Sequence, residues 1–342
     1  MKSLIRSALV GALANRTCAS WFRPLWKGRA SVFMLHRPYH AEHASTGHSA
    51  ESIAASIAAI RAAGARIVSL RSLFESHASG SAPEPGSVAF TIDDGYADQA
   101  GLARQFLQND CPVTIFLVSG FLDRKLWPWD QQLEYCVLKS PVDAIELPGV
   151  PKKLRLRSDR ERHAATDILQ RHVKGLRWPQ AQAKLAELWQ LLKVSPPNEA
   201  PAGTEALTWN EARQLEAEGV DFGPHSVTHR VASSLTDEES REEVQTSWKR
   251  LQDELRRPLP IYAWPTGRAA DFSMRDQQIA QDLGLGGAVS TNIGYGNFSA
   301  ATSTNGAMFG VNRFAFSSDT ETNVQYATAI ELIKHDLRSA FG

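Results

Sequence analysis

The sequence has few cysteines, no net charge and no long apolar run. Its three cysteines, Cys18, Cys111 and Cys136, lack a paired spacing, which argues against a disulfide framework and a zinc ribbon. The 37 lysines and arginines balance the 37 aspartates and glutamates, so the basic face typical of a nucleic-acid-binding protein is not expected. There is no internal repeat and no low-complexity tract. This cysteine usage fits a reducing compartment, and we therefore expect a cytoplasmic protein.

The first 30 residues contain an apolar stretch, residues 7–14, that is too short to span a bilayer and too weak for the core of a signal peptide. Three aromatic residues, Trp21, Phe22 and Trp26, follow it among basic residues. Two interpretations remain open. The segment lies on a membrane surface as a basic amphipathic helix, which would give peripheral membrane contact, or it packs on the protein. We therefore separate residues 1–30 from a domain that spans residues 31–342.

Short apolar segments alternate with helical patterns along most of the chain. The predicted strands are residues 31–36, 66–70, 87–92, 112–118, 220–224, 260–265 and 286–290. Helix starts lie between them, as in the capping boxes formed by Thr208 with Glu211 and by Thr236 with Glu239. Repeated strand–helix units with buried strands predict an α/β fold whose parallel sheet is either closed or open.

Residues 127–203 interrupt this alternation with a charged, helical stretch. Leu185, Leu188 and Leu192 recur there at helical spacing, which favours a packing face over a cofactor site. A proline-rich segment, residues 196–201, then leads back to the alternating pattern. We interpret the stretch as a helical insertion beside the mouth of the site, where it would contribute to substrate selectivity.

Two adjacent aspartates, Asp93 and Asp94, end the predicted strand that begins at Ser87, and Gly95 follows them. Two carboxylates at one strand end repel each other, and burying both is costly unless a cation or a proton intervenes. A catalytic metal accounts for the pair if one aspartate is a ligand and the other acts as a base. An ordinary Asp-Gly turn is the alternative interpretation.

A histidine pair, His225 and His229, follows another short apolar run that breaks at Gly223. Its spacing of four brings both imidazoles within reach of one ion. Catalytic zinc sites use three protein ligands of the histidine and carboxylate type and leave one position open. Asp94, His225 and His229 make such a set, and together the two clusters favour a divalent metal, with Zn²⁺ as the first choice.

Three motifs in order carry a resemblance to a known family. They are Thr-Ile-Asp-Asp-Gly (91–95), His-Ser-Val-Thr-His (225–229) and Tyr-Ala-Trp-Pro-Thr-Gly-Arg (262–268). In this order the chain resembles the polysaccharide deacetylases with a NodB-homology domain, of the type found with exopolysaccharide genes. The similarity extends over roughly residues 31–316.

The resemblance implies a distorted (β/α) barrel of about seven strands and the hydrolysis of N-acetyl groups on the amino-sugar residues of a glycan. A water molecule activated by the metal would attack the amide, and Asp93 would accept its proton, since the family assigns the base role to this first aspartate. A backbone N–H near Thr266 would stabilise the oxyanion. Trp264 would line the acetyl group or the sugar, or else serve as a core aromatic.

The chain departs from the classical family pattern at two positions. Many members carry an arginine two residues before the motif-three proline, where it orients the catalytic aspartate, but Ala263 stands there. Arg268 is the predicted replacement, and a solvated arginine is the alternative. Classical members also place a histidine in a late motif to protonate the leaving amine, whereas the one histidine after His229 in this sequence is His335, in a segment with the pattern of a surface helix. His36, which ends the first strand, is the candidate for that role or for substrate binding.

Two other functions remain open at this point. One is a deacylase or amidase of a small or lipid-linked sugar, which a cytoplasmic location would favour. The other is a catalytically inactive carbohydrate-binding barrel, against which the intact Asp93, Asp94, His225 and His229 argue. The sequence does not select the sugar, the polymer length or the oligomeric state.

Overall fold

The computed structural model describes residues 23–38, 47–150, 153–299, 307–329 and 331–332. Residues 1–22, which hold Cys18 and most of the predicted N-terminal amphipathic segment, lie outside the described residues. Within the described part of the chain, no helix combines the length and the apolar character needed to cross a membrane.

Seven parallel strands form a nearly closed barrel. Their order is β7–β4–β3–β1–β11–β9–β8, and every neighbouring pair in this order is parallel. The strands are β1 (Arg29–Leu35), β3 (Ser87–Asp94), β4 (Val113–Leu117), β7 (Asp221–Pro224), β8 (Ile261–Ala263), β9 (Gly287–Ile293) and β11 (Val311–Ala315). The two end strands approach each other where the backbone N–H of Leu259 donates to the carbonyl of Phe222 at 2.7 Å. The predicted distorted barrel of about seven strands is confirmed.

One predicted strand is not part of the barrel, and one barrel strand escaped prediction. Of the predicted segment 66–70 only β2 (Arg66–Ile67) is a strand, and it pairs with the start of β3. β11 instead takes a central place between β1 and β9. Its sequence, Val-Asn-Arg-Phe-Ala, carries an amide and a guanidinium in the middle, which hides it from a search for apolar runs. A further short strand, β10 (Gly296–Asn297), pairs antiparallel with β1.

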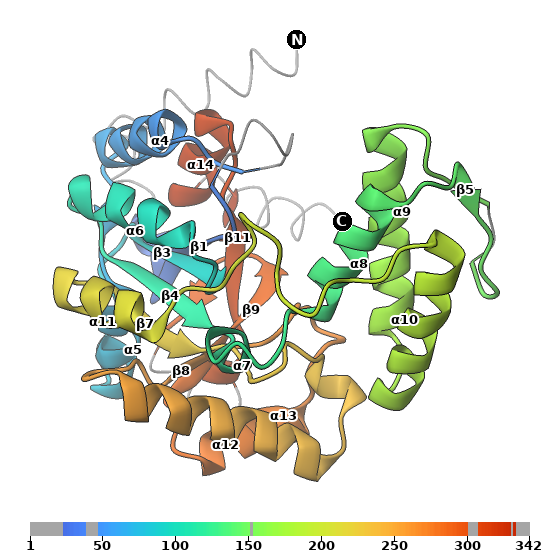
Figure 1. The fold of residues 1–342 in the computed structure, drawn as a ribbon. Coiled ribbons are helices and arrows are strands. Elements are labelled where there is room, and N and C mark those ends of the chain that lie inside the picture. The colour runs from blue at the N-terminus through green and yellow to red at the C-terminus, as the bar shows by residue number, and fades with distance from the viewer. Residues whose placement is uncertain (1–22, 39–46, 151–152, 300–306, 330, 333–342) are drawn as a thin grey trace, which may run out of the picture.

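Helices surround the barrel (Figure 1). They are α3 (Arg23–Trp26), α4 (Ala50–Ala62), α5 (Leu70–Ala78), α6 (Gln99–Gln108), α7 (Ser119–Leu122), α11 (Trp209–Glu218), α12 (Asp237–Glu254), α13 (Met274–Asp282) and α14 (Thr320–Ala327). The two predicted capping boxes are confirmed at the starts of α11 and α12, where each threonine and its glutamate bond reciprocally to backbone N–H groups. Ile53, Ile57 and Ile60 of α4 are buried against the barrel.

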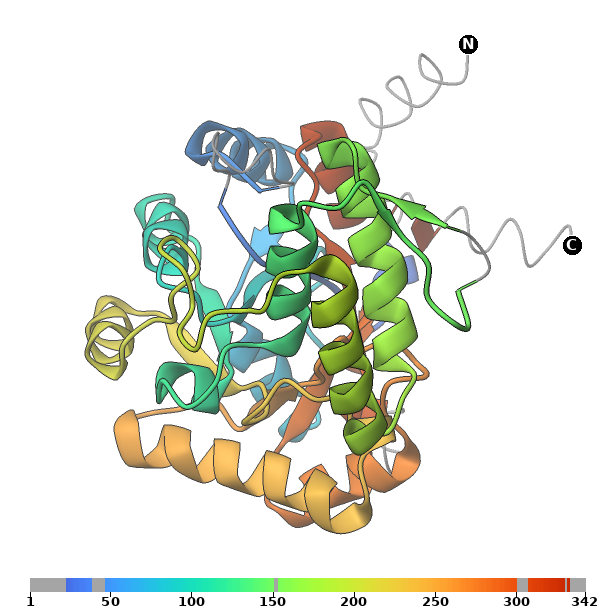
Figure 2. The ribbon, with the colours of Figure 1, turned by 45° about the vertical axis from the view of Figure 1, so that its right-hand side comes forward.

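The segment predicted as a helical insertion contains three helices and a small hairpin with an apolar core of their own. The elements are α8 (Trp129–Lys139), β5 (Ala144–Ile145), β6 (Leu154–Arg155), α9 (Asp159–Lys174) and α10 (Trp178–Leu192). Leu133, Leu169 and Leu188 are fully buried in that core, which does not merge with the barrel core. Figure 2 shows the three helices packed side by side along one flank of the barrel.

Candidate metal centre

Asp93 and Asp94 end β3, and the chain turns sharply behind them. Asp94 has a φ of 93° and Gly95 a φ of 91°. A positive φ is uncommon for a residue other than glycine. The buried side chain of Gln99 holds this turn: its oxygen accepts from the N–H groups of Gly95 and Tyr96, and its amide donates to the carbonyl of Asp93. The turn fixes the two neighbouring carboxylates in separate environments.

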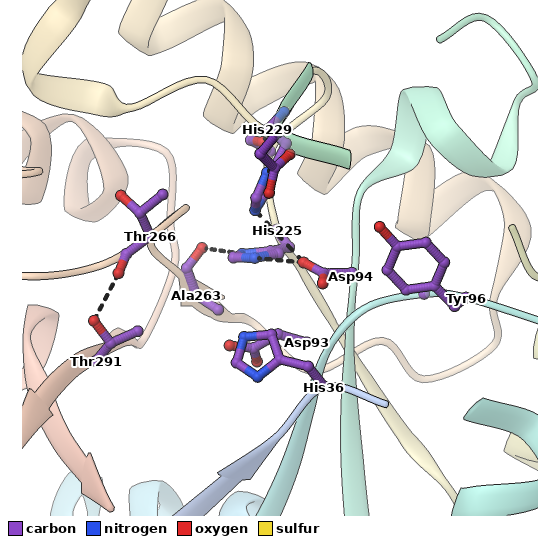
Figure 3. Close-up of polar contacts among 12 residues, drawn as sticks. His36, Asp93, Asp94, Tyr96, His225, His229, Ala263, Thr266 and Thr291 are labelled. Atoms are coloured by element: carbon purple, nitrogen blue, oxygen red, sulfur yellow. Dashed lines mark hydrogen bonds and ion pairs between the residues drawn. The ribbon is translucent and has the colours of Figure 1, made fainter. Parts of the chain in front are cut away.

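Asp94, His225 and His229 converge on one point, as the close-up in Figure 3 shows. Each offers one ligand atom, and these atoms lie within 4.8 Å of one another. The Nε2 atoms of His225 and His229 are 3.4 and 3.5 Å from Asp94 Oδ1. His225 directly follows β7, and His229 is placed by a turn in which Ser226 and His229 both have positive φ angles. Separate strand ends thus bring together the three residues that the sequence predicts as ligands.

The far nitrogen of each imidazole has a partner of its own. His225 Nδ1 lies 2.7 Å from the carbonyl oxygen of Ala263 in β8. Because a carbonyl only accepts, Nδ1 carries a hydrogen, and Nε2 is the ring nitrogen directed toward Asp94. His229 Nδ1 lies 3.3 Å from Asp130 Oδ1, which favours the same tautomer. Metal-binding histidines in proteins are held in this way by an acceptor behind the ring.

The electrostatics of the three residues suit a cation. Burial raises the pKa of Asp94, but the hydrogen bond from His225 and the charge of His229 outweigh it and hold that pKa well below its usual range. Burial lowers the pKa of His229, but Asp130 and then Asp94 raise it to about 9. Two imidazole nitrogens and one carboxylate oxygen fit a three-ligand zinc centre with one open position.

Asp93 has a different partner. Arg313 of β11, fully buried, donates from Nη1 to Asp93 Oδ1 at 2.8 Å and from Nη2 to Oδ2 at 2.7 Å. The same guanidinium also donates to the carbonyl of Ser290 and to Thr91 Oγ1. Burial raises the pKa of Asp93, but Arg313 outweighs this and lowers it. Asp93 is therefore an ionised carboxylate in a bidentate ion pair with Arg313.

Arg313 stands where we expected Arg268. Both oxygens of Asp93 accept from Arg313, whereas Arg268 is exposed and its backbone N–H donates to Asp271 at 2.8 Å. Arg313 was not predicted as a site residue because its strand, β11, does not read as an apolar run. An arginine that precedes Phe314 in a short segment of alternating pattern was the available signal.

The remaining predicted site residues differ in accessibility. Trp264 is 1% exposed, donates from Nε1 to the carbonyl of Phe309 and stacks on Phe272, so it is a core aromatic and presents no surface to a sugar. Thr266 has a φ of 57°, and its hydroxyl donates to Asp271. His36 follows β1, is exposed, and lies beside Asp93 in Figure 3.

Comparisons with known proteins agree with this geometry. The family model "Polysaccharide deacetylase" matches residues 80–288. No curated protein sequence matches the chain. The structure is similar to the Streptococcus pyogenes deacetylase PplD in complex with acetate, with a TM-score of 0.57 and 14% identity, covering 88% of this chain and 98% of that one. It is also similar to IcaB from Ammonifex degensii, with a TM-score of 0.55 and 12% identity, covering 87% and 97%.

A de-N-acetylase from Aggregatibacter actinomycetemcomitans is a third similar structure, with a TM-score of 0.52 and 14% identity, covering 86% of this chain and 99% of that one. At these identities the likeness concerns the barrel fold. The family match includes β3 with Asp93 and Asp94 and the turn with His225 and His229, but ends before β11 and Arg313.

Proposed function

Because the chain belongs to the polysaccharide deacetylase family, and is thus a hydrolase, we propose that it removes N-acetyl groups from amino-sugar residues of a polysaccharide or its glycan precursor. The observation that carries this proposal is the pairing of two sites at one end of the barrel. A three-ligand cluster of Asp94, His225 and His229 lies directly beside the ionised carboxylate of Asp93. A metal-dependent amide hydrolase needs both.

Asp94, His225 and His229 would hold a divalent metal, and Zn²⁺ suits their nitrogen and carboxylate donors best. Such an ion supplies Lewis-acid polarisation of the amide carbonyl and lowers the pKa of a water molecule. The residues prepare the centre in advance, since the carbonyl of Ala263 holds the His225 ring with Nε2 directed toward Asp94.

Asp93 acts as the general base in this proposal. Its carboxylate is 1% exposed and would be costly to ionise alone, but Arg313 compensates the burial and holds both oxygens in a fixed plane. The base is therefore ionised and oriented before substrate binds. A backbone N–H at Thr266 is the proposed donor to the oxyanion of the tetrahedral intermediate.

His36 is the proposed general acid for the departing amine. It is exposed, and its backbone carbonyl accepts from the Gln99 side chain that also bonds the Asp93 carbonyl. We expect His36→Ala to lower kcat by about 10²–10⁴-fold while metal content stays unchanged. Rates measured with substrates of different leaving groups check this, because a better leaving group needs less protonation. An unchanged kcat would reduce His36 to a substrate contact.

The proposal is tested by measuring metal content and acetate release together. Purified protein should contain one divalent metal per chain and should release acetate from N-acetylated amino-sugar oligomers. His225→Ala should lose both. Binding of the oligomers without acetate release would instead indicate a carbohydrate-binding barrel. Full metal content in both His225→Ala and His229→Ala would contradict the ligand assignment.

A further inference from the structure

The helical insertion contacts the metal centre through His229. At the start of α8, Trp129 donates from its indole Nε1 to the backbone carbonyl of His229 at 3.3 Å. The next residue, Asp130, places Oδ1 3.3 Å from His229 Nδ1. Consecutive residues of the insertion thus hold both the backbone and the ring of one histidine. His225 has no such dependence, because its ring is held by Ala263 of the barrel itself.

The start of α8 is itself fixed by the rest of the insertion. Gln170 of α9 donates its side-chain amide to the backbone carbonyl of Asp130 at 3.0 Å. The end of α9 is tied to the barrel, where Lys174 Nζ lies 2.6 Å from the buried carboxylate of Asp271. The position of Asp130 therefore depends on packing within the insertion and on its attachment to the loop after β8.

Asp130 is not a fourth ligand in this geometry. The two nitrogens of an imidazole ring point in different directions, and His229 directs Nε2 toward Asp94 and Nδ1 toward Asp130. Among the described residues, the group that can share one ion consists of Asp94, His225 and His229. The Asp130 carboxylate, whose side chain is 21% exposed, lies behind the ring, where an acceptor fixes the tautomer.

We propose that the insertion completes the metal centre, with Asp130 as the positioning residue that orients His229 for metal binding. This inference rests on the proposed function, since it assumes that His229 is a ligand. Without an acceptor at Nδ1, the ring loses both its preferred tautomer and its rotational restraint. The barrel supplies the three ligands, and the insertion determines how tightly they hold the ion.

Zinc affinity of the metal-stripped full-length protein tests this inference, measured by competition with a chromophoric chelator. Asp130→Ala should weaken Zn²⁺ binding about 10–100-fold, which is the usual effect of removing the hydrogen-bond partner of a metal-binding histidine. Asp130→Asn should lose less, because the amide oxygen still accepts from Nδ1–H. Glu146→Ala is the control: it removes an exposed carboxylate of the insertion that pairs with Lys153 and should leave the affinity unchanged.

Other outcomes distinguish a failure of the role proposed for Asp130 from a failure of the metal centre itself. Wild-type affinity in Asp130→Ala, together with loss of binding in His229→Ala, would overturn the role of Asp130 and leave the metal centre standing. No Zn²⁺ binding by the wild-type protein would overturn the metal centre and this inference with it. If Asp130→Ala fails to fold by circular dichroism, the comparison of Asp130→Asn with Glu146→Ala decides, and equal affinities would contradict the inference.

Discussion

The adjacent residues Asp93 and Asp94 at the end of β3 have different partners. Asp94 faces two imidazole nitrogens, and Asp93 is bound by a guanidinium on both oxygens. The sharp turn at Asp94, with its positive φ, directs the two carboxylates to different partners, so each can stay ionised despite the like charge beside it. This division of partners is the physical basis for assigning one aspartate to the metal and the other to the proton.

The ion pair with Arg313 should control the pH at which Asp93 can act. Arg313 lowers the pKa of Asp93 against the effect of burial, so its loss should raise that pKa. A base works only when ionised, so in Arg313→Gln the acidic limb of the kcat/KM profile should move to higher pH. Full pH–rate profiles of the variant and the wild type provide the measurement.

Arg268→Gln is the matched control for this prediction, because it removes an exposed guanidinium from the same region of the barrel. Its profile should coincide with that of the wild type. A shift in Arg268→Gln with none in Arg313→Gln would show that the assignment of the two arginines is reversed.

Residue types and spacing predicted the three residues that cluster at the candidate metal centre, because strand ends and a four-residue histidine spacing can be read directly from the sequence. The partners behind them were not predictable in this way. Ala263 contributes through its backbone carbonyl, which no side-chain pattern reveals. Asp130 and Arg313 lie 99 and 220 residues from the groups they contact, and only the fold brings them there.

At the scale of elements, one half-buried carboxylate joins three helices. Asp123, at the end of α7, accepts from the indole of Trp209 at the start of α11 and from the guanidinium of Arg250 in α12. Arg250 also lies over the Trp209 ring, 4.9 Å from its centroid. α7 follows β4 and packs against the turn that carries His225 and His229, since Gly120 N–H donates to the carbonyl of Val227. Asp123 therefore contributes to the stability of the region that holds the histidines.

Asp123→Asn should lower the free energy of unfolding by about 1–3 kcal/mol at pH 7, because it weakens charge-assisted hydrogen bonds to a largely buried group. Burial raises the pKa of Asp123, but Arg250, Trp209 and Lys125 lower it below the ordinary value of 3.8. The stabilisation is thus fully present above pH 3.8 and is lost as the pH falls through the lowered value. Denaturant unfolding as a function of pH measures the difference in the free energy of unfolding between the wild type and Asp123→Asn. This difference should become smaller only at acidic pH.

Asp143→Asn offers the comparison for an exposed ion pair. Asp143 lies 3.4 Å from Arg157, and both side chains are largely exposed. Its substitution should change stability by less than about 1 kcal/mol. Equal effects of the two substitutions would show that Asp123 is no more than a surface charge.

Most barrel strands were predictable because a strand buried on both faces reads as an apolar run, and β3 is buried along its whole length. β11 was missed for the converse reason. β11 carries Arg313, which pairs with Asp93, in the middle of its sequence. This charged residue interrupts the apolar pattern by which a strand is recognised. The predicted strand at residues 66–70 was wrong beyond Ile67, because β2 pairs only with the first two residues of β3 and α5 begins at Leu70.

At the scale of the whole molecule, the barrel and the insertion have separate apolar cores, and both contact the candidate metal centre. Metal binding should therefore stabilise the folded chain, since the three ligands come together only after folding. At a free Zn²⁺ concentration of about 100 times Kd the expected stabilisation is about 2.7 kcal/mol. Thermal unfolding with and without chelator should show a higher Tm with Zn²⁺, and this increase should vanish in His225→Ala. Identical Tm values for the wild type in both conditions would contradict the prediction.

The central claim, a bound metal beside a separate base, is tested most directly by acetate release and metal content of Asp93→Asn. An amide cannot accept the proton, but Asp94, His225 and His229 remain in place. We predict that the variant keeps its metal while acetate release from an N-acetylated amino-sugar oligomer falls by about 10²–10⁴-fold. A rate close to that of the wild type, or a loss of metal equal to the loss of rate, would contradict this account.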